Sequence, residues 1–321
     1  MIPKKLLVEL RKKRNKVFLV SSHVGLEGDA LGAELAVASL LEALGKKAVI
    51  FNEDRPPAEY GFLPHRTAIR PPTQGFAYDA AVIVDCSDIS RTGKVSQMIR
   101  KGKPLVNIDH HVSNTRFGTI NWVVPGASCA SEMVYRLFEA LKVKIKKPDA
   151  ICLYTGILAD TGSFQYSTTS SLTHHVAGEL LKHRIDAYRI HRFIYESMSF
   201  KTIKAFGRII QTLKTDETGK IAWLVMRRSL ICQEPALAEQ TDAVIHFARA
   251  VRGVEIALLF KEIRRNKEVR LNLRSTGRAD VNALAGVFGG GGHKMASGAT
   301  LHGRLQDVIE RVVAEAKKRI L

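Results

Sequence analysis

The sequence is poor in the features that mark membrane proteins and disulfide-stabilised secreted proteins. It contains no apolar run of about 18 residues, so no segment is expected to span a membrane. The apolar stretch at residues 6–8 is too short for a secretory signal. The cysteines show no C-x-x-C spacing, which predicts reduced thiols in a cytoplasmic protein and excludes a cysteine-based zinc site.

Aromatic and acidic residues are also scarce. Aromatic residues make up 7% of the chain, which argues against a long platform for stacking nucleic-acid bases. The 31 Asp and Glu residues face 49 Lys and Arg residues, and the net charge of +18 predicts a polyanionic substrate or partner. Basic residues gather in segments 1–16 and 252–278. For the first segment, a solvated helix face is as good an explanation as anion binding. The second segment leads into a glycine-rich run and therefore favours anion binding.

The first half of the chain alternates strand and helix patterns. Continuous apolar runs predict strands at residues 17–21, 47–51, 80–84 and 105–108. Helical periodicity falls between and after them, at residues 30–44, 95–101, 128–141 and 149–159. Apolar strands alternating with helices predict an α/β fold in which a parallel sheet is covered on both faces.

A length of 321 residues is sufficient for two domains, and the pattern changes near residue 186. A polar helical stretch covers residues 186–210, followed by strand patterns at 221–226, 254–260 and 268–274 and a terminal helix at 306–320. We therefore predict a first domain over residues 1–186, a helical linker over 187–205, and a smaller α/β domain over 206–321. The active site is expected in the cleft between the two domains.

Acidic and histidine side chains cluster where predicted elements of the first domain end. They are His23, Glu27 and Asp29 after the first strand, Asp85 after the third, Asp109, His110 and His111 after the fourth, and Asp160 after a helix. Taken singly, an Asp after a strand is usually a helix N-cap, and a His there is usually structural. Because the carboxyl ends of parallel strands share one sheet edge, the ensemble predicts a metal site instead.

Mixed imidazole and carboxylate ligands suit Mn²⁺ or a similar divalent ion. Two ions need a bridging carboxylate, and Asp85 is the natural candidate. Two metal ions about 3.5–4 Å apart activate water and stabilise the attacking and leaving oxygens of phosphoryl transfer. The pattern therefore predicts hydrolysis of a phosphoester, with a neighbouring imidazole that protonates or orients the leaving oxygen.

A second signal lies near the C-terminus, where Arg274 and Ser275 precede a glycine run, residues 289–292, that ends at His293. Glycines let the backbone approach a phosphate, and consecutive N–H groups form an anion nest. Arg274 is suited to clamp a phosphate with two donors, and His293 to donate to it. The alternative is a tight glycine turn between secondary-structure elements.

Together these residues resemble the DHH–DHHA1 phosphoesterase superfamily, whose name comes from the Asp-His-His triplet. Within it the chain is most similar to the stand-alone oligoribonucleases that also dephosphorylate pAp, and the resemblance spans residues 17–299. It implies two Mn²⁺ ions. One would be held by His23 and Glu27 and the other by Asp29, His110 and Asp160, with Asp85 bridging them. The resemblance also makes Asp109, which orients His110, and His111, which faces the scissile phosphate, catalytic together with Asp85.

The resemblance further implies that the smaller domain grips the substrate through Arg274, Ser275, Gly290, Gly291, Gly292 and His293. The implied substrates are short RNA or DNA oligonucleotides, linear dinucleotides such as pGpG, and pAp, with a homodimer as the assembly. The chain departs from the family in its first motif, where Leu26 and Glu27 replace the usual Pro and Asp. It departs again at Gln165, where many members have Arg.

Two other functions remain open from the sequence. One is a module of the same fold that binds a nucleotide or RNA with little turnover. The other is a hydrolase resembling the manganese pyrophosphatases, which would share the first domain but are not expected to carry the glycine-rich C-terminal signature. Loss of ligands would favour the binding module, and the only change of that kind is the conservative one at Glu27.

Overall fold

The structure is a computed structural model that describes residues 1–238 and 240–320. The chain divides into two compact units, Met1–Ser197 and Met198–Leu321. Among the described residues, no helix is both long enough and apolar enough to cross a bilayer.

The first unit is built on a six-stranded sheet in which all neighbouring strands are parallel, in the order β3-β2-β1-β4-β5-β6. The strands are β1 (Val17–Ser21), β2 (Lys47–Phe51), β3 (Ile69–Arg70), β4 (Ala80–Val84), β5 (Leu105–Asp109) and β6 (Ile120–Val123). The four predicted strands are confirmed. The β3 and β6 strands were not predicted, since one has only two residues and the other interrupts its apolar residues with Asn121.

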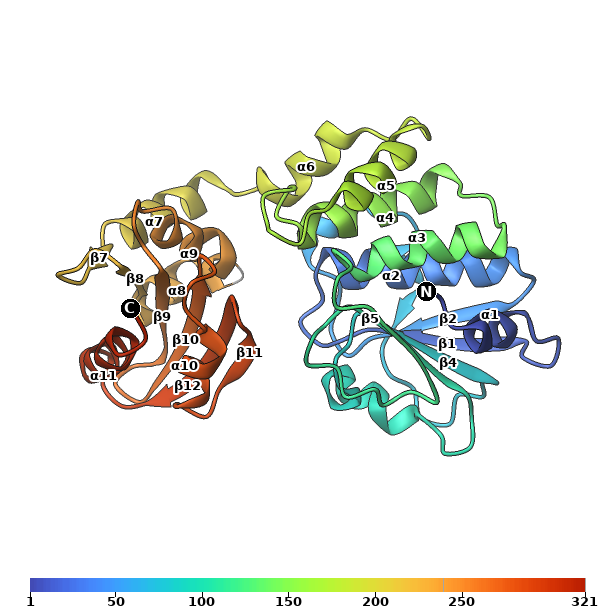
Figure 1. The fold of residues 1–321 in the computed structure, drawn as a ribbon, viewed down its shortest axis with the longest axis horizontal. Coiled ribbons are helices and arrows are strands. Elements are labelled where there is room, and N and C mark those ends of the chain that lie inside the picture. Colours follow the sequence, from blue (N-terminus) through green and yellow to red (C-terminus); the bar gives the residue numbers. More distant parts are fainter. Residues whose placement is uncertain (239, 321) are drawn as a thin grey trace. The chain divides into compact units, whose positions relative to one another are not determined.

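Helices cover one face of this sheet. They are α1 (Lys4–Arg11), α2 (Gly28–Ala43), α3 (Ala130–Leu141), α4 (Lys147–Asp160), α5 (Ser171–Leu181) and α6 (Ala187–Tyr195). Figure 1 shows α2 to α5 layered over the sheet. Alternate strand residues, such as Phe18 and Val20 in β1, point into this layer and form one core with the helices. The predicted parallel α/β architecture is confirmed.

The opposite face is closed by loops and short 3₁₀ segments. Leu19, Ile83 and Val95 belong to a separate core on this side. The helix predicted at residues 95–101 was wrong: the chain forms 3₁₀ turns over η3 (Ile89–Met98), interrupted at Gly93, whose φ of 59° is left-handed. The two other 3₁₀ segments of this unit are η1 (Ala58–Tyr60) and η2 (Arg66–Ala68).

The second unit has its own six-stranded sheet, in the order β11-β12-β10-β9-β8-β7. Only β8 and β9 pair in parallel, and the other described pairs are antiparallel. The strands are β7 (Lys214–Thr215), β8 (Ile221–Met226), β9 (Ile256–Arg264), β10 (Glu268–Ser275), β11 (Gly291–His293) and β12 (Ala296–His302). The strand predicted at residues 254–260 begins at Ile256 instead, because Val254 is held in a turn by the Val251 carbonyl.

Helices lie on both faces of this second sheet. They are α7 (Phe200–Ile210), α8 (Arg228–Gln233), α9 (Thr241–Arg249), α10 (Val281–Gly286) and α11 (Leu305–Lys317), with a 3₁₀ turn, η4 (Pro235–Ala238). One core joins α7 and α9 to β8 and β9, and another joins α10 and α11 to the opposite face. The α7 helix buries Phe206 and Ile209 in the first of these cores and is therefore an integral part of the second unit.

Candidate metal centre

The parallel strands of the first unit bring the predicted ligands to one sheet edge. His23 follows β1, Asp85 follows β4, and Asp109 is the last residue of β5. Since β1, β4 and β5 are neighbours in the sheet, their carboxyl ends meet. Ligand atoms within 4.8 Å of one another define three groups: His23, Glu27 and Asp85; Asp29, His110 and Asp160; and Asp85, Asp109, His110 and His111. The structure therefore brings together all six residues assigned to metal binding.

Asp85 lies at the centre of these groups. Its Oδ2 is 3.3 Å from Nε2 of His23, and its Oδ1 is 3.4 Å from Nε2 of His110. The two oxygens of one carboxylate thus face different imidazoles. Asp85 has a φ of 50°, a left-handed conformation that is uncommon outside glycine, and its N–H donates to the Ile108 carbonyl. Strained backbone of this kind is typical of functional sites, where the surrounding structure holds a residue in an unfavourable conformation.

His23 and Glu27 occupy the turn between β1 and α2. Nδ1 of His23 lies 2.8 Å from the Val24 carbonyl and donates to it, which directs Nε2 towards Asp85. Glu27 is the N-cap of α2 and accepts hydrogen bonds from the N–H groups of Asp29 and Ala30. The extra methylene of Glu27 therefore lets one carboxylate cap the helix and still lie within the ligand cluster.

Asp29 is held by a helix that lies far away in the sequence. Its two carboxylate oxygens accept the N–H groups of Ala130 and Ser131, at 2.6 and 2.8 Å, in the first turn of α3. A helix N-terminus stabilises a carboxylate through these donors and through its dipole. Gly156 permits the arrangement, because a Cβ there would lie 2.6 Å from Oδ1 of Asp29. No pattern in the sequence indicates this contact.

Asp109 was expected to orient His110, and this assignment was wrong. Oδ1 of Asp109 instead lies 2.7 Å from Nδ1 of His111. Its Oδ2 accepts a 2.6 Å hydrogen bond from Nδ2 of Asn114, a residue that sequence reasoning missed. Successive residues after a strand point in different directions. The side chain that Asp109 reaches is therefore that of His111, two positions later, and not that of His110. Asp109 is fully buried, and its role is to fix the ring of His111.

The electrostatics of the cluster reflect several carboxylates buried together. Burial and the Asp85 charge raise the pKa of Glu27 to about 7 and that of Asp29 to about 6. Burial opposes ionisation of Asp85 as well, but the His110 and His23 imidazoles hold its pKa well below the usual value. Burial disfavours the charged form of His23, yet the Asp85 carboxylate raises its pKa to about 9. Such a cluster is stabilised by an added positive charge.

The donor set fits divalent metal ions. Hard and borderline ions take carboxylate oxygens and imidazole nitrogens, and the three groups supply these atoms at ligand spacing. Oδ1 of Asp85 is buried and accepts no hydrogen bond from any described residue, so it has a lone pair available for an ion. The residues of these groups that could hold an ion include His23, Glu27, Asp29, Asp85, His110 and Asp160.

Two further acidic residues have different roles. Asp88 follows the same strand as Asp85, but it caps η3 through the Ser90 N–H and belongs to none of the groups. Glu34 of α2 is fully buried, and burial raises its pKa to about 8. Its Oε1 accepts from Asn52, whose Oδ1 in turn accepts from the N–H of Ser22. Glu34 thus supports the chain segment that carries His23.

The residues predicted to bind substrate lie in the second unit, at one end of β10. Arg274 is near the end of that strand, where its guanidinium contacts the Asp242 carboxylate and donates to the Leu273 carbonyl. Ser275 is 1% exposed, and its hydroxyl accepts the Gly277 N–H. Arg274 therefore lies at the surface with an acidic partner, whereas Ser275 points inward.

The glycine run follows α10 and enters a hairpin. Gly291–His293 forms β11, an edge strand that pairs with β12. Gly290 packs tightly, since a Cβ there would lie 2.6 Å from that of Ala299. Gly292 has a φ of 151°, a conformation that other residues rarely adopt. Close packing and backbone conformation therefore require glycine at positions 290 and 292.

Two family models match the chain. The model of the DHH family, N-terminal domain, matches residues 17–157. The model of the DHHA1 domain matches residues 234–320. The first match contains every residue of the three ligand groups except Asp160, and the second contains Arg274 and the glycine run.

Similar proteins cover nearly the whole chain. The chain is 28% identical to the bifunctional oligoribonuclease and PAP phosphatase NrnA of Thermus thermophilus, over 98% of this chain and 94% of that protein. It is 26% identical to the Bacillus subtilis protein of the same name, over 92% of each. An exopolyphosphatase-related protein from Bacteroides fragilis superposes with a TM-score of 0.90 at 23% identity, over 98% of this chain and 95% of that one.

Proposed function

Because the chain belongs to the DHH–DHHA1 phosphoesterase superfamily and is a hydrolase of phosphoester bonds, we propose that it cleaves short oligonucleotides to mononucleotides and removes a phosphate from pAp. The relatives that cover nearly the whole chain are named for these two activities, which supports the substrate class. Linear dinucleotides such as pGpG belong to the same class. The excess of basic residues suits a polyanionic substrate.

The observation that carries the proposal is the position of Asp85. Its two oxygens face His23 and His110. His23 lies in the ligand group that contains Glu27, and His110 lies in the group that contains Asp29 and Asp160. This is the arrangement expected of a bridging carboxylate between two divalent ions. We assign these ions as Mn²⁺, which accepts mixed nitrogen and oxygen ligands. When bound, a divalent pair lowers the pKa of water and stabilises the attacking and leaving oxygens.

The protein's own residues supply orientation and proton transfer. Asp109, which accepts a hydrogen bond from Asn114, fixes the ring of His111 through its contact with Nδ1. Nε2 is then the nitrogen that can exchange a proton with substrate. His111 then donates a proton to the leaving oxygen or holds it by a hydrogen bond. In the second unit, Arg274 and His293 bind substrate phosphates. Arg274 would exchange its exposed partner Asp242 for a phosphate.

Product analysis by chromatography tests the proposal. A 5′-phosphorylated RNA dinucleotide, a five-nucleotide RNA, a 24-nucleotide RNA and pAp are incubated with Mn²⁺, with and without EDTA. We expect EDTA-sensitive release of mononucleotides, fastest from the shortest RNAs, and release of phosphate from pAp. Equal rates on the 24-nucleotide RNA, or turnover that survives EDTA, would contradict the proposal.

A binding module without turnover is the second candidate, and the geometry of Glu27 favours it. Both carboxylate oxygens of Glu27 accept backbone N–H groups of α2, and these bonds compete with ligation of a metal ion. If no substrate is turned over while RNA still binds, the Glu27→Asp variant decides between the two. Activity that appears in this variant would identify a weakened enzyme, and continued inactivity would identify a binding module.

A further inference from the structure

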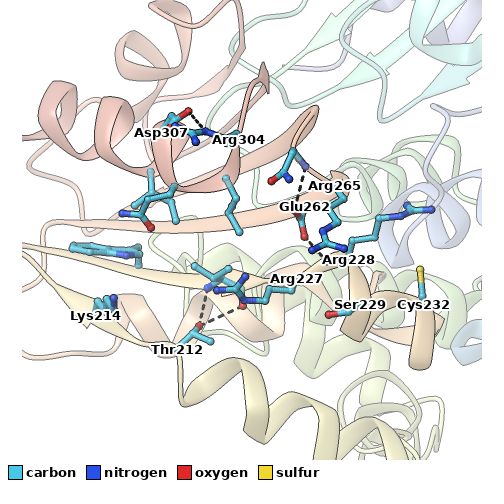
Figure 2. Close-up of a pocket in the computed structure, with 16 residues that line it drawn as sticks. Thr212, Lys214, Arg227, Arg228, Ser229, Cys232, Glu262, Arg265, Arg304 and Asp307 are labelled. Atoms are coloured by element: carbon cyan, nitrogen blue, oxygen red, sulfur yellow. Dashed lines mark hydrogen bonds and ion pairs between the residues drawn. The ribbon is translucent and has the colours of Figure 1, made fainter.

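The second unit contains a large pocket that the metal centre does not use. The pocket has a volume of about 970 Å³, and all of its lining residues belong to the second unit (Figure 2). It lies between the β7–β8 edge, the β9–β10 turn and the first turn of α11. A pocket of this volume is within the range that accommodates a small-molecule ligand.

The floor of the pocket is apolar and includes an indole ring. Trp223 and Val225, alternate residues of β8, point to the same face of the sheet as α11. Leu305 and Ile309 of α11 are buried against this face, whereas Trp223 and Val225 remain partly exposed. A partly exposed indole at a sheet edge offers a planar apolar surface on which a nucleotide base stacks.

The walls are basic, and their acidic groups are already satisfied. The carboxylate of Glu262 accepts the backbone N–H groups of Arg228 and Asn266. That of Asp307 is paired with Arg304 at 2.9 Å, as Figure 2 shows. Five basic side chains line the pocket against these two carboxylates, so three positive charges are in excess.

Three cations remain in excess. Lys214, Arg227 and Arg265 line the pocket, are exposed, and form no ion pair with any residue that the structure describes. Lys214 is the cross-strand partner of Trp223, so its side chain lies on the same face as the indole ring. Guanidinium groups bind phosphate with two parallel N–H donors, and a lysine adds a point charge.

The pocket is separate from the predicted substrate residues of the same unit. In the β9–β10 pair, Glu268 lies opposite Arg264 at one end, and Arg274 lies opposite Ala257 at the other. The pocket includes Arg265, in the turn beside the first end. At about 3.4 Å per residue, the two ends of the strand are roughly 20 Å apart.

We propose that this pocket is a second nucleotide-binding site, in which the base stacks on Trp223 and the phosphate binds Arg227, Arg265 and Lys214. A free mononucleotide and the terminal nucleotide of an oligonucleotide would both present a base and a phosphate to this pocket. No residue of the metal centre lines the pocket, so the site goes beyond the proposed hydrolysis and does not depend on it.

Tryptophan fluorescence reports on this site directly. The chain has two tryptophans, and Trp122 is 2% exposed in the core of the first unit. The full-length protein is titrated in EDTA, to prevent turnover, with 5′-AMP, a 5′-phosphorylated five-nucleotide RNA and inorganic phosphate. We expect saturable quenching by AMP that is absent from the Trp223→Phe variant. Phosphate alone should not quench and should compete only at tenfold or higher concentration.

Paired charge variants separate a site from general attraction. Arg227→Ala/Arg265→Ala should weaken AMP binding at least tenfold. Arg252→Ala/Arg311→Ala removes the same charge from exposed positions outside the pocket and should leave the affinity within twofold. RNA binding at least tenfold tighter than AMP binding would identify a terminal oligonucleotide unit as the ligand, and equal affinities a free mononucleotide. The proposal is overturned if neither ligand quenches, if quenching persists in Trp223→Phe, or if both double variants lose affinity equally.

Discussion

In the first unit, Asp29, Asp85 and Asp109 are at most 3% exposed, whereas Arg227 and Arg265 of the second unit are exposed to solvent. The difference fits the ligands proposed for each group. Carboxylates crowded away from water hold a small divalent cation strongly, because the surroundings screen little of the attraction. Exposed arginines attract a flexible polyanion over a longer range, and salt weakens that attraction. The first unit is therefore suited to chemistry, and the pocket of the second unit to binding of an anionic ligand.

The largest expected effect is on the bridging carboxylate. Asp85→Asn removes the charge that faces both His23 and His110 and should lower kcat by about 10³-fold or more in the presence of Mn²⁺. Asp88→Asn, three residues away, changes a residue that caps η3 and accepts the Thr115 hydroxyl but belongs to none of the ligand groups, and it should retain kcat within about threefold. Steady-state kinetics on the RNA dinucleotide compares the two variants, and similar losses in both would remove the special role of Asp85.

A second prediction concerns the packing that brings Asp29 into the cluster. Gly156→Ala places a methyl group against Oδ1 of Asp29 and the side chain of Ser131, and should lower the stability of the first unit by about 3 kcal/mol. Gly178→Ala in α5 has open space around the new methyl and should raise stability by about 0.5 kcal/mol. Thermal unfolding of both variants tests the contrast, and a tolerated Gly156→Ala would mean that α2 and α4 separate easily.

A third prediction uses the buried acid Glu34. Its folded pKa of about 8 is above the ordinary 4.5, so the folded state binds the extra proton and stability falls as the pH rises between these values. Glu34→Gln removes this dependence and should gain on the order of 4 kcal/mol relative to wild type between pH 5 and pH 9. Glu42→Gln, at an exposed position of the same helix, should leave the pH profile unchanged.

Denaturant unfolding in EDTA, followed by Trp122 fluorescence in a Trp223→Phe background, reports on the first unit alone. A pH profile in Glu34→Gln that matches wild type would show that Glu34 does not carry a buried proton.

The smallest effect is expected in the second unit. Arg274→Ala should raise KM about tenfold and make it less dependent on salt, with kcat almost unchanged, because the proposed role of this side chain is to bind a substrate phosphate and not to transfer a proton. Arg270→Ala lies four residues earlier on the same face of β10 and should change KM by less than twofold. A selective loss of kcat in Arg274→Ala would contradict the division of roles between the units.

The sequence predicts those parts of the fold whose signal is local. Continuous apolar runs identify β1, β2, β4 and β5, and the position of Asp85 and Asp109 at strand ends follows from parallel pairing. Short or polar-interrupted strands such as β3 and β11 give no such signal, because pairing with a neighbour defines them.

The candidate site shows the same limit. The ligand cluster is predictable because its residues follow strands, but the contacts that hold it are not. Asp29 depends on N–H groups about a hundred residues further along the chain. Which imidazole Asp109 contacts depends on side-chain direction, which spacing alone does not determine.

The most direct test of the central claim is the number of metal ions that Asp85 organises. Calorimetric titration of the metal-free protein with Mn²⁺ should give two ions per chain in the wild type and in Asp88→Asn. Asp85→Asn should bind at least one ion 100-fold more weakly. A stoichiometry of one or none in the wild type, or two tightly bound ions in Asp85→Asn, would contradict the account.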